Sequence, residues 1–223
     1  MEDADPYRPD CTFDDGTAII LGTEYWFKCE PITWKILSSS GRAYCLVLTL
    51  FLDAHRYNQC YYGRTSNGRY ENNYEKSEIR EWLNGDFYKT AFALGNSKIH
   101  TVAVDNSEAS ALYPENSYVC SGTKDKIYLL SGKEYVTADY GFAPLYNIHD
   151  PVRQCKTSDW ARANGAYSYT GSSYLYNGYY WTRSPYSISY YAWFVGYNDS
   201  PNNHDRVGVS CRSARPAITI KIA

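Results

Sequence analysis

Four residue types are missing from the C-terminal part of the chain. No Lys, Glu, Gln or Met occurs between Thr157 and Ile220, although Lys and Glu are among the commonest residues in proteins. Surface patches that bind other proteins are also depleted in Lys and Glu and enriched in aromatic residues. The absence therefore favours a binding surface over a catalytic pocket in this part of the chain.

Other absences limit the class of protein. The formal net charge is only −2 in 223 residues, so no long-range field attracts nucleic acid and no nucleic-acid partner is expected. The longest apolar run, residues 44–52, is too short to span a bilayer, so no membrane insertion is expected. The first residues contain neither a basic nor an apolar segment, so no signal peptide is recognised.

The cysteines do not form a metal-binding pattern. All seven are widely spaced, at positions 11, 29, 45, 60, 120, 155 and 211, with no C-x-x-C pair. Zinc sites usually need such a pair, so no metal and no cofactor are expected. A disulfide framework would leave one thiol over. We favour mostly free, partly buried cysteines, which pack as small hydrophobic residues.

Tyrosine is abundant where Lys and Glu are missing. Ten tyrosines fall between Tyr167 and Tyr197, mixed with Ser, Asn, Gly and Asp. Antibody binding loops use this combination, because Tyr gives rigid contact area while Ser, Gly and Asn adapt their hydrogen bonds. The candidate ligand-binding residues are Tyr186, Ser189, Tyr190, Tyr191, Tyr197, Asn198, Asp199, Asn202, Asn203, His204, Asp205 and Arg206. The alternative is a solvated, turn-rich loop whose tyrosines pack on their own core.

The periodicity of apolar residues predicts an α+β fold of short antiparallel strands, two or three short helices and long loops. Strands are expected at 23–37, broken by Glu30-Pro31, and at 43–50, 125–130 and 217–222. One helix should start after a Ser77 cap and end at Asn84-Gly85, and another should span 87–93. A third, at 158–163, should be capped by Thr157. Residues 1–10 should be flexible, and residues 11–223 should form a single domain.

Several segments resemble a bacterial and phage family with the C-type-lectin-like fold. They are YWFKCEPITWKIL (25–37), LDAHRYN (52–58), NNYEKSEIREWLNGDFYKTAF (72–92), KIYLLSGKEY (126–135), CKTSDWARANGAY (155–167), YYWTRSP (179–185), AWFV (192–195) and VGVSCRSARPAITI (207–220). The most specific part is Trp181-Thr182-Arg183-Ser184-Pro185 together with Arg215-Pro216-Ala217. The resemblance implies a lectin-like fold and a bacterial-surface, secreted or phage-particle location. The spacing of cysteines and the sugar-binding Glu-Pro-Asn motif of typical C-type lectins are missing, so calcium-dependent sugar binding is not implied.

Some members of this fold resemble the variable proteins of diversity-generating retroelements, which randomise adenines, typically in Asn codons. Such codons cannot yield Lys, Glu, Gln, Met or Trp. From Tyr186 to Ser213 every residue except Trp193 belongs to the reachable set. The resemblance thus implies a variable region at about 179–213. We expect Trp181, Arg183, Trp193 and Arg215 to be framework, with the two arginines pinning loops through carbonyls or a carboxylate.

The resulting hypothesis is a non-enzymatic, ligand-binding protein with a hypervariable surface, whose partner is a protein or glycan on another cell or host surface. Four tryptophans, Trp34, Trp82, Trp181 and Trp193, would fill its core. A cysteine-dependent enzyme of the formylglycine-generating type, using Cys211, is the alternative from another class. An undiversified carbohydrate-binding module and a purely structural module are further alternatives. The oxygens of residues 198–205 could bind calcium, although Asn-Asp-Ser-Pro is also a turn signal.

Overall fold

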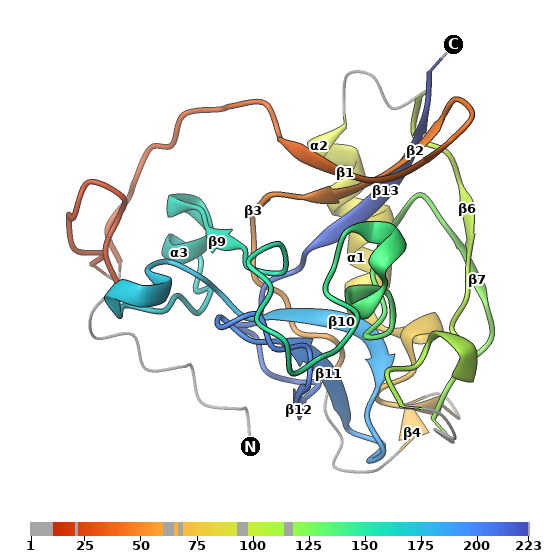
Figure 1. The fold of residues 1–223 in the computed structure, drawn as a ribbon. Coiled ribbons are helices and arrows are strands. Elements are labelled where there is room, and N and C mark those ends of the chain that lie inside the picture. Colours follow the sequence, from red (N-terminus) through yellow and green to blue (C-terminus); the bar gives the residue numbers. More distant parts are fainter. Residues whose placement is uncertain are drawn as a thin grey trace.

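The computed structural model describes residues 11–20, 22–59, 65–66, 69–92, 98–113 and 118–222. These residues form short strands, short helices and long connecting segments (Figure 1). The predicted α+β class is confirmed. The segment 1–10, predicted to be flexible, lies outside the described residues, and so does Cys60. Among the described residues, no helix is long and apolar enough to cross a membrane.

The described strands are β1 (Trp34–Ser40), β2 (Ala43–Leu48), β3 (Leu50–Phe51), β4 (Thr65–Ser66), β5 (Arg69–Tyr70), β6 (Val102–Val104), β7 (Thr123–Asp125), β8 (Ile127–Leu129), β9 (Lys156–Thr157), β10 (Tyr180–Pro185), β11 (Tyr191–Val195), β12 (Asn203–Arg206) and β13 (Pro216–Lys221). The α-helices are α1 (Glu78–Trp82), α2 (Tyr88–Ala91) and α3 (Asp159–Ala163). The short turns are the 3₁₀ turns η1 (Tyr74–Lys76), η4 (Glu108–Ser110), η5 (Glu134–Val136), η6 (Ala138–Tyr140) and η7 (Ser172–Tyr174), and the π-helical turn η2 (Leu83–Phe87).

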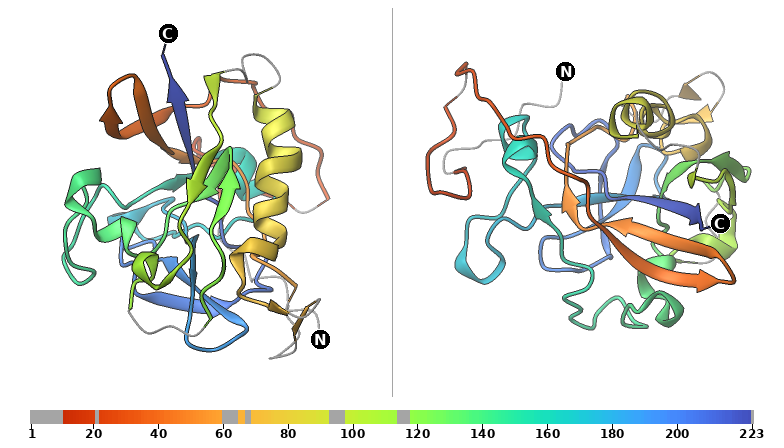
Figure 2. Two further views of the ribbon diagram at one scale, coloured as in Figure 1. Left: turned by 90° about the vertical axis from the view of Figure 1, so that its right-hand side faces the viewer. Right: turned by 90° about the horizontal axis from the view of Figure 1, so that it is seen from above.

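The largest sheet contains the C-terminal strand at its centre. Its order is β1-β2-β13-β8 and its neighbours are antiparallel. The strand predicted at 43–50 is confirmed as β2 and β3, and the one predicted at 217–222 as β13. Ile218 of β13 lies opposite Leu46 on one side and Ile127 on the other. Because β13 joins early and middle parts of the chain, it closes the domain (Figure 2).

A second sheet, β10-β11-β12, lies at the opposite end of the molecule from the β1–β2 hairpin (Figure 1). All six residues of β10 are buried. Successive side chains of a strand point to opposite faces, so Trp181 joins one core cluster and Tyr180 the other. The strand β10 is therefore packed on both faces, which makes it a rigid support for the first turn of this sheet.

The helical segment follows the predicted start but not the predicted end. The Ser77 hydroxyl accepts a hydrogen bond from the Arg80 amide, which confirms the cap of α1. Asn84-Gly85 does not end the helix, because the chain continues through η2 into α2 (Figure 2). The Asn84 side chain donates to the Ile127 carbonyl at 2.8 Å and accepts from the Lys126 amide at 3.0 Å. These bonds join η2 to β8 and accompany the wider π turn.

The cap predicted for the third helix is wrong by one residue. Ser158, and not Thr157, accepts the capping hydrogen bond from the Ala161 amide at 3.1 Å. Thr157 belongs to β9, where its amide donates to the Tyr176 carbonyl. The helix ends at Ala163, the end of the predicted range, with Asn164 as its C-cap and Gly165 in the left-handed region at φ 103°. Only glycine adopts that conformation without steric cost.

The prediction of a strand at the start of 23–37 is wrong. Residues 23–33 adopt no regular secondary structure, and β1 begins only at Trp34. Tyr25 and Phe27 instead pack around Phe13, with ring centroids 4.9 and 6.0 Å away. Phe27 also contacts Trp160 of α3. The alternation that suggests a strand thus reflects a segment anchored through every second side chain, while Trp26 stays 90% exposed.

The tryptophans expected in the core differ in burial. Trp181 is fully buried and Trp193 is 7% exposed, whereas Trp34 and Trp82 are only partly buried against the first core cluster. Trp181 packs edge-on against Tyr57 and donates its indole N–H to the His55 carbonyl at 3.0 Å. It is therefore the tryptophan on which the fold depends most.

Trp181→Ala should lower the free energy of unfolding by about 3–5 kcal/mol, the range for truncating a buried tryptophan to alanine. Trp26→Ala is the matched control, because its side chain is exposed, and it should change stability by less than about 0.5 kcal/mol. Denaturant unfolding of both variants measures the difference. Equal losses would show that the exposed segment contributes as much as the core.

Candidate binding surface

The residues predicted to bind ligand lie on the β10-β11-β12 sheet and on the two turns that join its strands. The first turn, residues 186–190, connects β10 to β11. The second, residues 196–202, connects β11 to β12. Asn198, His204 and Arg206 are exposed, and Tyr186, Tyr190, Tyr191, Tyr197, Asn202, Asn203 and Asp205 are half-buried. The fold thus brings most of the predicted set to one end of the molecule.

Two of the predicted contact residues are buried instead. Ser189 is 7% exposed and Asp199 is 3% exposed. The Ser189 carbonyl accepts from the Asn72 amide at 2.9 Å, so this residue ties the first turn to the domain. Asp199 has a positive φ of 66°, and its carboxylate faces His149 and Gln154. Both residues therefore shape the turns and present little side-chain surface to the solvent.

One group of aromatic side chains, the Tyr186 cluster, comprises Tyr113, Tyr186, Tyr191, Trp193 and His204. The Tyr186 ring stacks on His204 with centroids 3.9 Å apart and planes inclined by 7°. Trp193 packs edge-on beneath Tyr186 at 4.7 Å and lies opposite His204 in the β11–β12 pair. Because Trp193 is buried while His204 is exposed, the tryptophan supports the rings above it.

A second group, the Tyr197 cluster, comprises Tyr167, Tyr169, Tyr174, Tyr179 and Tyr197. Tyr197 stacks on Tyr169 with centroids 4.0 Å apart, and Tyr179 packs edge-on against Phe194 at 5.3 Å. Phe194 and Trp193 are adjacent in β11 and so point to opposite faces of the sheet. The tyrosine-rich sequence is thus divided between two clusters.

The alternation along β11 does not decide the position of Tyr197. If the strand continued to residue 197, alternation of side chains would place Tyr191, Trp193 and Tyr197 on the same face of the sheet. In the structure β11 ends at Val195, and the turn carries Tyr197 to Tyr169 and Tyr179. Tyr191 and Trp193 therefore belong to the Tyr186 cluster, whereas Tyr197 does not.

Sequence reasoning missed Tyr113 and Tyr146, which extend the Tyr186 cluster. The Tyr113 hydroxyl donates to the Asn202 side chain at 2.8 Å, across 89 positions of sequence. Its ring lies 5.3 Å from Trp193 and 6.0 Å from Tyr146. Both tyrosines are over a third exposed. Each is an isolated aromatic in a loop, and no local pattern marks it as part of a distant surface.

The charged groups near these clusters are paired with one another. His149 Nδ1 lies 2.5 Å from Asp199 Oδ2. Arg212 binds Asp205 and covers the rings of Tyr179 and Phe194, with its Cζ 4.3 and 4.5 Å from their centroids. Tyrosine hydroxyls are protonated at neutral pH, and burial raises the pKa of Tyr113 and Tyr197 further, so both can donate hydrogen bonds. The surface therefore offers aromatic faces and hydroxyls with little net charge.

The two predicted framework arginines are buried and bind main-chain oxygens. Arg183 donates to the Leu129 carbonyl at 2.9 Å and forms a two-pronged pair with the Glu134 carboxylate. Arg215 donates to the carbonyls of Leu48 and Arg153, both at 3.0 Å. A guanidinium suits this role because its donors spread in a fixed plane. Arg183, in β10, thus joins that sheet to β8 and η5, whereas Arg215, just before β13, joins β2 to Arg153 and to the Tyr180 hydroxyl of β10.

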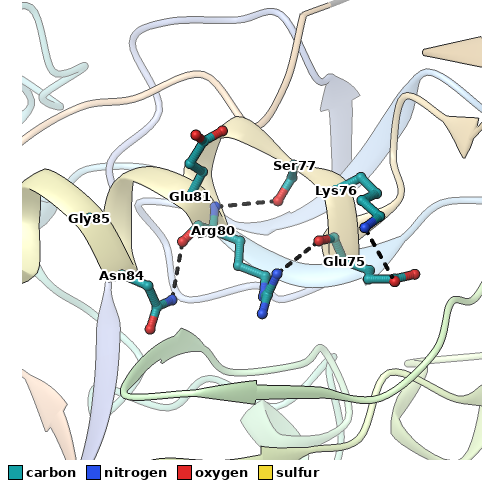
Figure 3. A pocket seen from close by; sticks show the side chains of 7 residues that line it. All are labelled: Glu75, Lys76, Ser77, Arg80, Glu81, Asn84 and Gly85. Atoms are coloured by element: carbon teal, nitrogen blue, oxygen red, sulfur yellow. Dashed lines mark hydrogen bonds and ion pairs between the residues drawn. The ribbon is translucent and has the colours of Figure 1, made fainter. Parts of the chain in front are cut away.

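A polar groove of about 600 Å³ runs along η1, α1 and η2 (Figure 3). Its lining residues are Glu75, Lys76, Ser77, Arg80, Glu81, Asn84 and Gly85. Its cations already have partners: Lys76 lies 3.7 Å from Glu75, and Arg80 lies 2.6 Å from Asp125. Ser77 and Asn84 are used for capping and for binding β8. The groove is therefore a weaker candidate than the aromatic surface.

The metal and cysteine alternatives find little support in the geometry. Within the described ranges, no group of three or more His, Cys, Asp or Glu side chains could hold a metal ion. Asp199, the central carboxylate of the calcium alternative, faces His149. Cys211 is only 4% exposed, whereas a nucleophilic thiol must reach its substrate. Cys29, Cys45 and Cys155 carry free thiols, as favoured from the sequence.

Comparison with known proteins places the domain in one family. A family model described as "Domain of unknown function (DUF6273)" matches residues 45–222. The match covers the strands from β2 to β13 and thus the whole β10-β11-β12 sheet. No curated protein and no solved structure matches the chain.

Proposed function

We propose that this chain, which belongs to the DUF6273 family, is a ligand-binding protein that presents a variable Tyr-, Asn- and His-rich surface. In this proposal the scaffold is of the C-type-lectin type, and a diversity-generating retroelement varies the surface. The ligand is a protein or glycan on another cell or host surface. The single observation that carries the proposal is the Tyr186 cluster, where exposed and half-buried rings rest on the buried Trp193.

The physical chemistry of the Tyr186 cluster supports binding. Stacking of Tyr186 on His204 fixes two side chains before a ligand arrives, which lowers the entropy lost on binding. Tyr and Trp anchors dominate the energetics of protein interfaces. The half-buried Tyr190 lies beside Tyr191, with centroids 4.9 Å apart, and widens the surface. Preorganised rings with adaptable polar neighbours are the features of antibody binding sites.

The position of Trp193 supports variation of this surface. It is the one residue between 186 and 213 that a randomised Asn codon cannot produce. Trp193 is 7% exposed and carries Tyr186, Tyr113 and His204 on its ring. A fixed, buried tryptophan beneath exchangeable exposed residues is the arrangement that a variable binding surface needs.

A display library tests the proposal without knowledge of the natural ligand. Tyr186, Tyr190, Tyr191, Asn202, His204 and Arg206 are randomised together, and the library is selected against lysozyme. We expect folded clones that bind lysozyme with a Kd of about 1 μM or lower, a free energy near −8 kcal/mol. The parent chain and clones with the six positions changed to Ser are the controls and should not bind. A library that yields mainly unfolded clones, or no binder, contradicts the proposal.

A further inference from the structure

We infer that Asn72 is a positioning residue that holds the 186–191 turn in one shape whatever side chains the turn carries. The importance of this role for recognition rests on the proposed function. Asn72 lies just before η1, outside the predicted variable region, and is fully buried. It is separated from the turn by more than 110 positions of sequence, so only the fold brings them together.

Asn72 donates hydrogen bonds to main-chain carbonyls along the whole 186–191 turn. Its side-chain Nδ2 lies 3.1 Å from the Tyr186 carbonyl and 3.0 Å from the carbonyls of Ile188 and Tyr191. Its backbone N–H donates to the Ser189 carbonyl at 2.9 Å. One residue therefore reaches four carbonyls of a segment of six residues. The two hydrogens of Nδ2 are shared among three of these carbonyls, and those of Ile188 and Tyr191 also accept from backbone amides of the turn. Buried carbonyls without a donor would each cost free energy, so this set of bonds favours one turn conformation over others.

All four acceptors belong to the main chain. Every amino acid supplies the same carbonyl, so exchanging a side chain of the turn leaves these bonds in place. Several side chains of the turn reach the solvent: Ile188 is 41% exposed, and Tyr186 and Tyr190 are half-buried. Asn72 thus fixes the backbone and leaves the chemistry of the surface free to change.

Asn72 can act as a fixed point because its own segment is anchored. The Tyr57 hydroxyl donates to the carbonyls of Asn72, at 3.3 Å, and of Arg183, at 3.1 Å. The Asn58 side chain donates to the Glu71 carbonyl at 2.9 Å. These bonds connect the segment to β10 and to the core, so displacement of the turn requires displacement of buried groups.

The second turn is held in a similar manner. Asn177, 3% exposed, donates through Nδ2 to the Tyr197 carbonyl at 2.9 Å. This bond is again made to a main-chain oxygen, so it does not depend on which side chain stands at position 197. Asn177 lies before the predicted variable region at 179–213, as Asn72 does. Two buried amides thus bind the backbone of the two turns that display the candidate residues.

Native-state hydrogen exchange tests the role of Asn72. Asn72→Asp keeps the shape of the side chain but replaces the donor by a carboxylate facing three carbonyls, and Asn72→Ser is the milder variant in case the first does not fold. The amides of Tyr186 and Tyr191, which bond within the turn, should exchange about 10- to 100-fold faster in either variant. The amide of Ile218 in β13 is the reference and should follow only the change in global stability.

Two control variants separate positioning from general destabilisation. Among the described residues, the neighbouring Asn73 side chain bonds to Lys76 and not to the turn, so Asn73→Ala should leave exchange in the turn equal to the reference. Ile188→Ser removes an exposed side chain but keeps its carbonyl, and should also leave exchange unchanged. Equal acceleration at Tyr191 and Ile218 in the Asn72 variants, or acceleration by Ile188→Ser, would overturn the inference. The assay contains no ligand, so failure of the proposed function would not alter its outcome.

Discussion

Raising the pH above about 10 should unfold the protein cooperatively, because buried tyrosines cannot ionise in place. Burial raises the pKa of Tyr57, Tyr74 and Tyr128 above the ordinary value, and it raises the pKa of Tyr140 to about 12. In the unfolded chain the same hydroxyls ionise near pH 10. The folded state therefore holds protons that the unfolded state releases, and stability is lost as the pH rises from about 10 toward 12.

The alkaline transition can be followed by tyrosinate absorbance and far-ultraviolet circular dichroism together. We expect both signals to change in one steep step. The buried Cys155 thiol adds to the effect at the lower end, because burial raises its pKa to about 11, against about 8.5 in the unfolded chain. A gradual titration near pH 10 with no loss of secondary structure would contradict the burial of these tyrosines.

Tyr135 and Tyr57 provide a matched pair of variants for the same transition. Both are fully buried, and burial raises the pKa of each well above its usual value. The Tyr135 hydroxyl has no hydrogen-bond partner among the described residues, whereas the Tyr57 hydroxyl donates to the Arg183 carbonyl at 3.1 Å. Tyr135→Phe should therefore move the alkaline midpoint upward without loss at pH 7. Tyr57→Phe should cost about 1 kcal/mol at pH 7 for the lost hydrogen bond.

Arg183→Met should lower the free energy of unfolding by about 3–5 kcal/mol, the usual cost of removing one partner of a buried ion pair. The variant leaves the Glu134 carboxylate without its two-pronged partner and the carbonyls of Leu129 and Asp105 without their donors. Arg183 is 2% exposed, so water cannot take its place at the buried Leu129 carbonyl, whereas Glu134, 25% exposed by side chain, can be hydrated in part.

Arg206→Met is the control for Arg183→Met, because Arg206 belongs to the same sheet but is exposed. Its stability should change by less than about 0.5 kcal/mol. The double variant Arg183→Met with Glu134→Gln should recover part of the loss, since no unpaired charge remains buried. Denaturant unfolding of the three variants measures these differences. A loss for Arg206→Met as large as for Arg183→Met would contradict the division into framework and display residues.

Local sequence patterns predict the helices and strands of this fold correctly where residues close in the sequence determine them. The caps and apolar stripes around Ser77 and the alternation in 217–222 each produce the expected element, because neighbouring residues determine these features. The pattern in 23–29 fails, since alternation cannot show whether a partner strand exists. The helix end at Asn84-Gly85 fails as well, because the Asn84 side chain bonds to β8, which lies more than 40 positions away.

The candidate surface is predictable in its composition but not in its geometry. The missing Lys and Glu and the abundant Tyr point to residues that the structure places on one sheet, β10-β11-β12, and its turns. The burial of Ser189 and Asp199 depends on Asn72 and His149, which lie far away in the sequence. Tyr113 joins the surface through contacts with Trp193 and Asn202. No pattern within a single segment reports such contacts.

Sequencing the coding region for residues 179–213 in independent isolates tests the central claim, a variable surface on a fixed scaffold. Substitutions should concentrate at adenines in the codons of exposed or half-buried residues such as Tyr186, Tyr190, His204 and Arg206. The codons of Trp181, Arg183 and Trp193 should be constant, and a near-copy of the region should lie beside a reverse-transcriptase gene. Substitutions spread equally over buried and exposed codons, or no variation and no such neighbours, would contradict the account.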